Sequence, residues 1–475
     1  MNIYLIANSN MSEIQFVKNY FKLRKNINMK HRISVEKNIS SVKWLLLIIH
    51  FFEYLISFYR YNEKSNNIYI YVRNNCLLLV KKDYIKILND SHFDVMYGDS
   101  LVKSAKEQWY ESRPTVSPLL LEQYDYVGDI ILSKIRLDDD KTFRQNIRKI
   151  VNKGAKIHNL ECALSLRDAK FFSKYDRPIL IDDFEEVVYD SDQKLNRVNF
   201  CKTAISIVIP TAFRSDGKFN IANCLNTLIP KLNDFLVEII LVFHEKDSKH
   251  FDSLRDQLTF DVSIRAKTYA IDFNFSHAVN LGIKYSKNEI LLLLNDDLLF
   301  EYGCEFKHAF NHILSNEKIG AVGALLLRDR LEISHAGLYF KNGIPDNYLN
   351  GTKLDTLPEI TLHCREVSGV TGALILIRKS VIENIGFFDT FFPNDYNDVD
   401  LMLRLVGAGY SNLVCTHLKV LHKESMSRGI SDVSSTLLDL KLLNSYHGPL
   451  PLRDRYLFSP CMRLPKKFFN EQDYN

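Results

Sequence analysis

The sequence predicts an α/β fold for residues 203–435, with parallel strands covered by helices. Short apolar runs rich in β-branched residues recur there, and segments with helical spacing of apolar residues separate them. The strand-like runs are AISIVIPT (204–211), FLVEIILVF (235–243) and EILLLLNDD (289–297). Strands that alternate with helices indicate βαβ units, in which neighbouring strands run parallel and helices cover the sheet.

The elements between these strands follow in order. NIANCLNTLIPKL (220–232) has apolar residues every three or four positions, which predicts a helix. A polar stretch that permits a short helix (244–258), a strand in VSIRAKTYAI (262–271) and a helix through SHAVNLGIKYS (276–286) complete the series. The pattern therefore predicts an α/β sandwich whose ligand binds beyond the carboxyl ends of the strands.

Domain boundaries follow from composition. The chain has 475 residues, which suits two or three domains of roughly 100–200 residues each. Residues 176–202 are charge-rich without a sustained period, which favours a linker. We therefore expect an N-terminal domain (1–175), a main domain (203–435) and a C-terminal tail (436–475) of mixed helical and irregular structure.

Charge and cysteine usage exclude some classes of function. The net charge of +4 arises from 61 basic and 57 acidic residues, and no long basic block interleaved with aromatic residues occurs. This balance argues against nucleic-acid binding. The eight cysteines are scattered without a CxxC pair, so the spacing indicates neither a zinc site nor a disulfide framework and favours a reducing cytosol.

One apolar stretch bears on membrane contact. WLLLIIHFFEYLISFY (44–59) contains His50 and Glu53 and, with 16 residues, falls short of the roughly 20 that a membrane span requires. The first ten residues also lack the pattern of a signal peptide. We expect a cytoplasmic chain, with a buried or interfacial helix here that permits peripheral contact with the inner face of the cytoplasmic membrane.

Two adjacent acids end the predicted strand at 289–297. Asp296 and Asp297 follow four leucines and Asn295. Carboxylates at the carboxyl end of a strand suit Mg²⁺ or Mn²⁺ held against the phosphates of a nucleotide. By itself the pair is more typical of a solvated turn than of a metal site, and the features downstream reverse this preference.

Further charged residues occur in NDYNDVDLMLRL (394–405) and VLHKESMSRG (420–429). Acids at 395, 398 and 400 enter a predicted helix, where each can cap the helix N-terminus. Asp398 is in addition placed to act as a general base. His422, otherwise a structural histidine, is a candidate third metal ligand, and Arg428 a candidate phosphate contact.

These segments together resemble a known family. SIVIPT, DFNFSHAVNLGI, EILLLLNDD, SHAGLYF, VTGALILIRKSVIENIGFFD, YNDVDLMLRLVGAGY and LHKESMSRG are similar, in this order, to the motif series of glycosyltransferase family 2. The resemblance is closest to bacterial rhamnosyltransferase-like members that build cell-surface polysaccharide. It covers 203–430, and the ordered series is more specific than any single motif.

The resemblance implies a GT-A fold, a nucleotide-diphosphate sugar donor, Mn²⁺ or Mg²⁺ as cofactor, and inversion at the anomeric carbon. The acceptor would be a glycan or lipid-linked glycan, and no nucleic acid partner is implied. The implied nucleotide-sugar contacts are Pro210, Thr211, Asn280, Asp296, Gly372, Ala373 and Arg428. The other implied roles are metal binding by Asp297, Asp296 and His422, base catalysis by Asp398, and sugar contacts by His335 and Asp395.

The second strand departs from the family pattern. Members usually carry an Asp soon after this strand, which holds the nucleobase. This chain has Phe243 and His244 there, with Glu245 and Asp247 as possible substitutes. The identity of the nucleotide therefore stays open.

An internal comparison suggests a second copy of the fold. NIYIYVRNNCLLL (67–79), set beneath EILLLLNDDLLFE (289–301), places Asn74 and Asn75 on Asp296 and Asp297. Residues 93–132 and 147–167 also resemble parts of the first domain of two-domain family 2 enzymes. Because asparagine lacks the charge that binds a divalent cation well, we expect residues 1–175 to be a degenerate α/β glycosyltransferase-like or accessory domain.

Three hypotheses about function result. The first is an inverting glycosyltransferase of surface polysaccharide synthesis, of the O-antigen or capsule kind. The second is a non-catalytic scaffold that binds a glycan or nucleotide. The third is a nucleotidyltransferase, which would also use an acidic pair but does not call for the segments at 394–405 and 420–429. The acids, the base and the histidine occur together in 289–422, which favours the first.

Overall fold

The chain divides into two compact units, Met1–Asp183 with Arg455–Asn475 (unit 1) and Phe184–Asp454 (unit 2). Each is treated by itself. The predicted linker, 176–202, lies outside the described residues. The computed structural model describes residues 2–7, 19, 32–37, 67–72, 77–78, 88, 91–103, 108–111, 117, 130–138, 143–168, 203–213, 220–260, 262–356, 364–423, 433–451 and 454–456.

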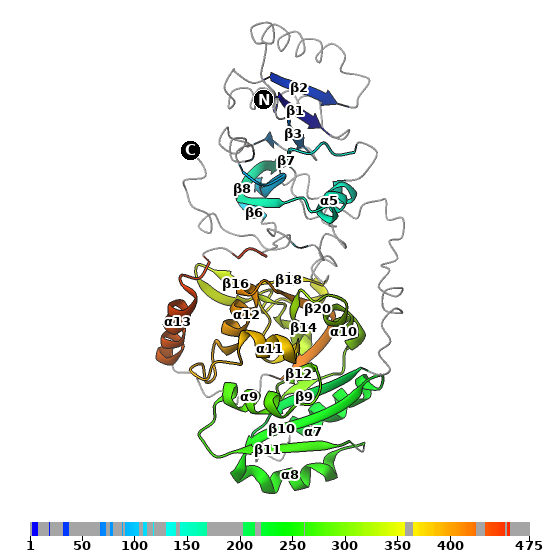
Figure 1. Cartoon of the computed structure of the whole chain (residues 1–475), viewed down its shortest axis with the longest axis vertical. Coiled ribbons are helices and arrows are strands. Elements are labelled where there is room, and N and C mark those ends of the chain that lie inside the picture. Colours follow the sequence, from blue (N-terminus) through cyan, green and yellow to red (C-terminus); the bar gives the residue numbers. More distant parts are fainter. Residues whose placement is uncertain are drawn as a thin grey trace. The chain divides into compact units, whose positions relative to one another are not determined.

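Unit 2 is built on a mixed sheet (Figure 1), and the predicted α/β class is confirmed. Along the sheet the strands run β11 (Ile264–Tyr269), β10 (Leu236–His244), β9 (Ala204–Pro210), β12 (Ile290–Leu294), β19 (Leu374–Arg378), β14 (Ile319–Arg328), β20 (Ser411–His422) and β13 (Leu298–Leu299). β15 (Glu332–His335) pairs with β14, β18 (Arg365–Val367) pairs with β20, and β16 (Leu338–Lys341) and β17 (Ile344–Asn347) form a separate ladder.

The direction of the strands changes in the middle of this sheet. The predicted strands β9, β10, β11 and β12 are parallel neighbours. β19, however, runs antiparallel to both β12 and β14. Because it is antiparallel, β19 begins at the edge of the sheet where β12 ends.

Helices cover both faces of this sheet (Figure 1). They are α7 (Asn220–Leu228), α8 (Ser248–Leu254), α9 (Phe275–Tyr285), α10 (Phe306–Ser315), α11 (Lys379–Ile385), α12 (Asn397–Gly407) and α13 (Val433–His447). Single-turn 3₁₀ segments are η3 (Ile229–Leu232), η4 (Glu245–Asp247), η5 (Arg255–Gln257), η6 (Asp329–Leu331) and η7 (Leu354–Thr356). The helix predicted over 220–232 changes to 3₁₀ after Leu228, where Pro230 lacks the N–H that an α-helix needs.

The core lies on both faces of β12. All five of its residues are buried, as expected for a strand covered by helices on both sides. Leu291 and Leu293 pack in one hydrophobic cluster with α9, α11 and α12. Because side chains alternate along a strand, Leu292 and Leu294 face the other side, where α10 packs against the neighbouring strands β14, β19 and β20.

The predicted C-terminal tail begins inside unit 2. Leu443 of α13 and Leu450 pack against Phe340, Phe392 and Val399. The Phe340 N–H also donates to Asp454 Oδ2 at 2.9 Å. The domain boundary predicted at residue 435 therefore falls within α13 (Val433–His447), which belongs to unit 2.

Unit 1 holds a second mixed sheet. Its strands lie in the order β2 (Arg32–Lys37), β1 (Asn2–Ala7), β3 (Asn67–Val72), β7 (Ile130–Ser133), β5 (Val95–Lys103), β8 (Ile157–Asp168) and β4 (Leu77–Leu78), and β6 (Gln108–Glu111) pairs with β5. Helix α5 (Phe143–Asn152) lies between β7 and β8 in the sequence.

The two sheets share one topology. In chain order, β1 to β4 correspond to β9, β10, β12 and β13, and β5 to β8 correspond to β14, β15, β19 and β20. Neighbouring strands of unit 1 run in the same relative direction, parallel or antiparallel, as the corresponding neighbours of unit 2. For example, β7 is antiparallel to β3 and β5, as β19 is to β12 and β14. The comparison of 67–79 with 289–301 sets β3 on β12 and β4 within one residue of β13. Asn74 and Asn75 themselves lie outside the described residues.

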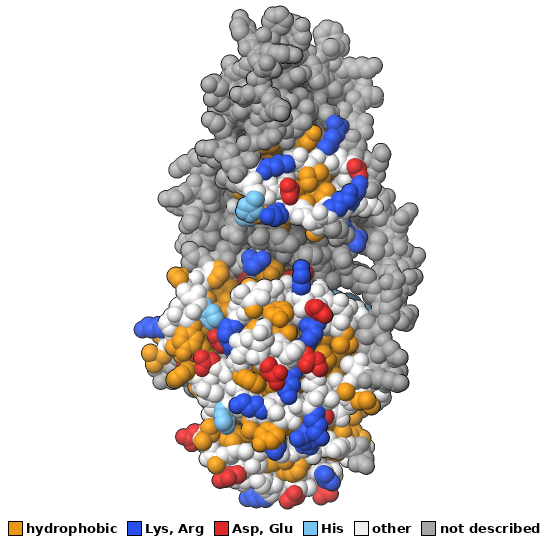
Figure 2. Space-filling view, viewed as in Figure 1, with side chains coloured by type: hydrophobic (Ala, Val, Ile, Leu, Met, Phe, Trp, Pro, Cys, Tyr) orange, Lys and Arg blue, Asp and Glu red, His pale blue; other side chains and the backbone are white. Residues whose placement is uncertain are grey.

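The surface of the described residues mixes charges of both signs. On the face of unit 2 shown in Figure 2, Lys and Arg alternate with Asp and Glu, in line with the small net charge. Among the described helices, none is long and apolar enough to cross a membrane. The segment 44–59, expected to permit membrane contact, lies outside the described residues.

Close packing between α9 and the sheet predicts a clear stability effect. A Cβ at Gly282 would lie 2.2 Å from Val208 Cγ1 and 3.1 Å from Val242 Cγ2. Gly282→Ala should therefore lower the free energy of unfolding by about 1–3 kcal/mol, as overpacking does. Urea unfolding of the full chain, followed by circular dichroism, measures this change.

Gly407→Ala is the matched control, because a Cβ at Gly407 meets nothing within 4 Å. It should leave stability unchanged or raise it by up to about 1 kcal/mol. Equal stability of the two variants would contradict the close contact of α9 with β9.

Candidate functional site

The carboxyl ends of β9 and β12 form one side of the site. The two strands are parallel neighbours, so both chains leave the sheet at the same edge. Pro210 is the last residue of β9, and the Thr211 that follows donates its hydroxyl to Asp296 Oδ2 at 2.6 Å. The predicted contacts Thr211 and Asp296 are therefore brought together, and the hydrogen bond orients the carboxylate.

The second acid lies beside His422. Asp297 is 8% exposed, and its Oδ1 lies 3.4 Å from His422 Nε2. The short antiparallel ladder of β13 with β20, in which Leu298 faces His422, holds them together. The Lys423 N–H also donates to the Asp297 carbonyl at 3.1 Å. Two residues 125 positions apart are thus fixed next to each other by backbone pairing.

The start of β19 forms the opposite side of the site. Leu294 pairs with Leu374 in the antiparallel ladder, and the Asn295 N–H donates to the Ala373 carbonyl at 2.9 Å. Gly372, one residue earlier, donates its N–H to Asp398 Oδ2 at 2.8 Å. The predicted residues Gly372, Ala373 and Asp398 therefore lie at the same sheet edge as the acids of β12.

Asp398 occupies the first turn of α12. Tyr396, at the N-cap, has the left-handed φ of 57°, which turns the chain sharply into the helix. The Val399 N–H donates to Asp398 Oδ1 at 2.8 Å, so each carboxylate oxygen accepts one backbone hydrogen bond. The half-buried carboxylate is oriented by the backbone and by the positive end of the helix.

His335 is buried next to Thr371 and is not exposed at the site. It is 2% exposed. Its Nε2 accepts the Thr371 N–H at 3.3 Å, and its Nδ1 lies 2.7 Å from Asn347 Oδ1. A backbone N–H can only donate, so the proton of the neutral ring is on Nδ1. Burial lowers the pKa of His335 to about 4, while the hydrogen bond to Asn347 acts in the opposite direction.

Two other predicted site residues have contacts within the chain. Asn280 was expected at the nucleotide, but its amide donates to the Phe388 carbonyl at 2.7 Å and accepts the Phe388 N–H at 3.0 Å. Both ends of the amide therefore hold α9 to the segment before α12, and the contact of Asn280 with the nucleotide stays a prediction. Asp395 is partly buried just before α12, and its charge raises the pKa of Asp439 on α13, an effect second to burial.

The third acid of 394–405 has a structural role. Asp400 is 1% exposed. Its Oδ2 accepts from Arg404 at 2.7 Å, and its Oδ1 lies 2.9 Å from His447 Nε2 of α13. Nothing in the spacing of the sequence predicts the pairing with His447, since the two residues are 47 positions apart.

In the second strand, Phe243 stands where the family pattern has an Asp, and its side chain lies in the core. Phe243 is 1% exposed and packs edge-on against Phe213 with ring centroids 5.1 Å apart. His244 ends β10 and accepts the Lys246 N–H, and Glu245 and Asp247 form η4.

Arg428, the predicted phosphate contact, lies outside the described residues. Sequence reasoning missed Thr371, although it lies within a quoted motif.

The donor set fits a hard divalent cation. Carboxylates of Asp296 and Asp297 and an imidazole nitrogen of His422 are ligands that Mn²⁺ accepts, and Mg²⁺ favours the carboxylates. The 3.4 Å between Asp297 Oδ1 and His422 Nε2 is close to the separation of about 3 Å between adjacent ligands of one octahedral ion. The pKa of the nearby Cys224 thiol is raised by burial first and then by the negative charges of Asp296 and Asp297.

The chain was compared with known proteins. No family model matches it. It is 28% identical over 229 residues to the O-antigen biosynthesis protein RfbC of Myxococcus xanthus. The match covers 47% of this chain and 18% of that protein, so the chain spans less than a fifth of the relative's length. The chain is thus similar to a protein of O-antigen biosynthesis, in agreement with the resemblance that its motifs predict.

Two solved structures show a weaker likeness. GalNAc-T7 with UDP, GalNAc and Mn²⁺ matches with a TM-score of 0.39 and 12% identity, over 51% of this chain and 48% of that chain. The mannosyltransferase PcManGT of Pyrobaculum calidifontis with GDP-Man and Mn²⁺ matches with a TM-score of 0.35 and 12% identity, over 55% and 72%. Because both TM-scores lie below 0.5, neither likeness carries an argument about this chain.

The buried His335 predicts a pH dependence of stability. Its pKa of about 4 in the folded chain lies below the ordinary value of 6.5. The unfolded chain therefore binds the proton first, and folded-state stability falls as pH drops from about 6.5 to about 4, by roughly 3 kcal/mol in total.

His335→Gln should remove this fall of the free energy of unfolding between about pH 6.5 and 4. Gln does not titrate, and it can still accept the Thr371 N–H. Urea unfolding of both proteins at several pH values between about 7 and 4.5 measures the difference. Above pH 7 the two curves should run parallel. Equal slopes below pH 6.5 would contradict the assignment of a buried neutral ring.

Proposed function

We propose that unit 2 is an inverting glycosyltransferase of the family 2, GT-A kind. It would move a sugar from a nucleotide-diphosphate donor to an acceptor hydroxyl. The observation that carries this proposal is the meeting of Asp297, His422 and Asp398 at one sheet edge, from three separate elements. The ordered motifs and the similarity to an O-antigen biosynthesis protein support it.

The acids after β12 would hold the donor. Asp297 and His422, with Asp296, would bind Mn²⁺ or Mg²⁺, which when present offsets the charge that develops on the departing diphosphate. Thr211 already orients Asp296 through its hydroxyl, leaving that carboxylate to contact the ribose or the ion. Pro210 and Thr211 would border the nucleotide, and Arg428 remains a predicted phosphate contact.

Asp398 would be the general base. The Gly372 N–H holds its Oδ2, so that the carboxylate can accept the proton of the acceptor hydroxyl as that oxygen attacks the anomeric carbon. Inversion requires a single displacement, and no protein nucleophile is needed. Gly372 and Ala373 would border the donor sugar, with Asp395 near the acceptor.

His335 would position the segment that borders the sugar. Its ring is engaged by the Thr371 N–H and by Asn347, so its effect on the donor would pass through the backbone of 371–373. This assigns it a positioning role in place of the direct sugar contact that the resemblance implies.

The acceptor is proposed to be a glycan or lipid-linked glycan of surface polysaccharide, of the O-antigen or capsule kind. The printed name of the relative supports this class. A cytoplasmic location with peripheral membrane contact remains the expectation from the sequence, and segment 44–59 is where such contact would be sought.

Unit 1 is proposed to be a non-catalytic copy. It shares the strand order of unit 2, yet asparagines 74 and 75 align with the two acids. The first turn of α5, which corresponds to α12, contains no acidic residue. The scaffold hypothesis therefore applies to unit 1, whereas the chemistry is assigned to unit 2.

A panel of nucleotide sugars tests the proposal. The full chain is incubated with each donor and Mn²⁺, and binding is followed by calorimetry and nucleoside diphosphate release by a coupled assay. Binding and slow hydrolysis of one donor class are expected. If no nucleotide sugar binds with or without Mn²⁺, the proposed function is wrong.

Asp297→Asn should abolish metal-dependent release of nucleoside diphosphate. The amide keeps the shape of the carboxylate but loses the charge that binds the cation. A fall in turnover of at least about 100-fold at fixed Mn²⁺ is expected. Asp234→Asn, which alters an exposed carboxylate paired with Lys307, should retain full turnover. Wild-type rates in Asp297→Asn would overturn the metal assignment.

Asp398→Asn should separate binding from transfer. Asparagine can still accept the Gly372 N–H but cannot take a proton, so donor affinity should be kept while kcat falls by about 10²–10⁴-fold. Calorimetry with the donor and steady-state kinetics measure the two quantities. Loss of donor binding together with transfer would make Asp398 a structural residue.

A further inference from the structure

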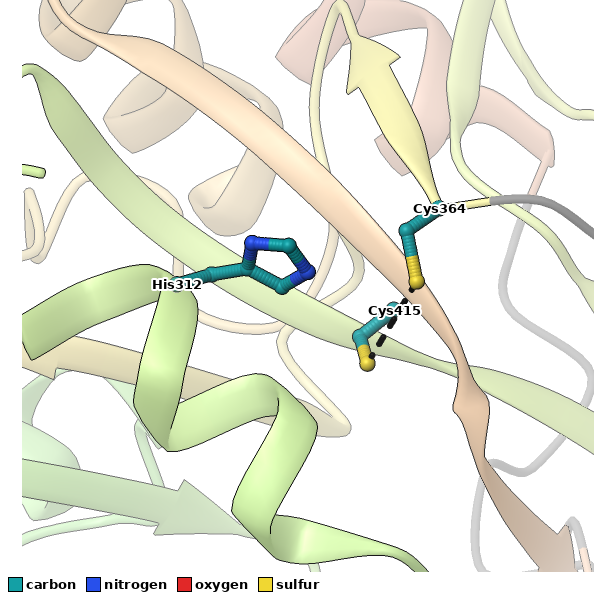
Figure 3. Close-up of side chains that lie close together, drawn as sticks. All are labelled: His312, Cys364 and Cys415. Atoms are coloured by element: carbon teal, nitrogen blue, oxygen red, sulfur yellow. Dashed lines mark hydrogen bonds between the residues drawn. The ribbon is translucent and has the colours of Figure 1, made fainter. Parts of the chain in front are cut away.

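A cluster of sulfur and imidazole groups lies apart from the proposed active site. The ligand atoms of His312, Cys364 and Cys415 all lie within 4.8 Å of one another. Figure 3 shows the His312 ring reaching from α10 towards the two thiols, which come from the start of β18 and from β20. Cys364 is 1% exposed and Cys415 is 0% exposed.

The antiparallel pairing of β18 with β20 explains the two thiols. Arg365 pairs with Val414, so Cys364, one residue earlier, stands opposite Cys415, one residue later. Directly opposed residues project to the same face of a sheet. Their sulfur atoms are 3.7 Å apart, well beyond the roughly 2.05 Å of a disulfide bond.

A bulge in β20 places a second imidazole next to Cys364. Ala324 of β14 pairs with Cys415, but the next residue of β14 pairs with Lys419, so that three residues of β20 have no counterpart in that ladder. His417 lies within this bulge, and its Nδ1 is 3.2 Å from Cys364 Sγ. Bulges often redirect a side chain for a specific purpose.

We propose that His312, Cys364 and Cys415 bind a structural Zn²⁺ ion. Thiolates and imidazoles are the donors that Zn²⁺ takes in structural sites. In a tetrahedral site two ligating sulfurs lie about 3.8 Å apart, and the 3.7 Å between Cys364 Sγ and Cys415 Sγ is close to this value. His417 lies beside these three ligands without belonging to the set.

Zn²⁺ binds the thiolate form of cysteine, so its binding would release the thiol protons of Cys364 and Cys415 to solvent.

The ion would differ from that of the active site in chemistry and in role. The soft donors select Zn²⁺, whereas the carboxylates at 296 and 297 suit Mn²⁺ or Mg²⁺. A Zn²⁺ here would tie α10, β18 and β20 together, on the strand that ends at His422. The site would therefore support the fold of unit 2 without taking part in transfer.

Metal analysis of the full chain tests the proposal. Protein purified without chelators and dialysed should contain about one Zn²⁺ per chain by mass spectrometric elemental analysis. Cobalt exchanged into the protein should give a thiolate-to-cobalt charge-transfer band. Cys364→Ser and Cys415→Ser should lose the zinc and the band, while His312→Gln should weaken metal binding.

Two matched variants serve as controls. Cys304→Ser removes a half-buried cysteine outside the cluster, and Asp297→Asn removes the proposed active-site ligand. Both should keep the zinc and the band, which separates this proposal from the proposed function. Circular dichroism shows whether each variant is folded.

Three outcomes would overturn the proposal. The first is a wild-type protein that contains no zinc and gives no cobalt band. The second is a zinc content in the folded Cys364→Ser and Cys415→Ser variants equal to that of the wild-type protein. The third is a wild-type mass that, without reductant, is lower by two hydrogens than the reduced mass, with the difference mapped to a Cys364–Cys415 disulfide. The cobalt band of the wild-type protein decides the question even if the serine variants do not fold.

Discussion

The antiparallel pairing of β12 with β19 is the constraint on which the rest of unit 2 depends. It joins Leu294, just before the acids, to Leu374, just after Gly372 and Ala373. On its other side β12 is parallel to β9, which brings Thr211 to the same edge. A slip of this ladder by one residue would separate the Asn295 N–H from the Ala373 carbonyl to which it donates and would move the acids out of register with Gly372 and Ala373.

The polar groups around this edge are held mainly by backbone hydrogen bonds. His335 accepts from Thr371, Asn280 is bonded to both polar groups of the Phe388 backbone, and Asp398 accepts from Gly372. Such bonds fix side chains without relying on other mobile side chains. A site that is organised before substrate arrives loses less in ordering when it binds.

The two units show that one strand topology can carry different residues at corresponding positions. Strand order and sense agree from β1–β8 to the corresponding strands of unit 2, while asparagines 74 and 75 of the sequence align with Asp296 and Asp297. The comparison of 67–79 with 289–301 predicts this relation correctly for β3 and β12, since local strand patterns survive when loop residues change.

The sequence by itself determined the α/β class and the strands at 204–211, 235–243 and 289–297, because periodicity and strand ends are local patterns. The hydrogen bond of Thr211 with Asp296 came from the structure. It missed the antiparallel β19, the engagement of Asn280 by Phe388, and the Asp400–His447 contact. It also indicated no zinc site, since Cys364 and Cys415 are 51 residues apart. Only the tertiary structure decided these features, because strand register and long-range packing choose partners that no local pattern records.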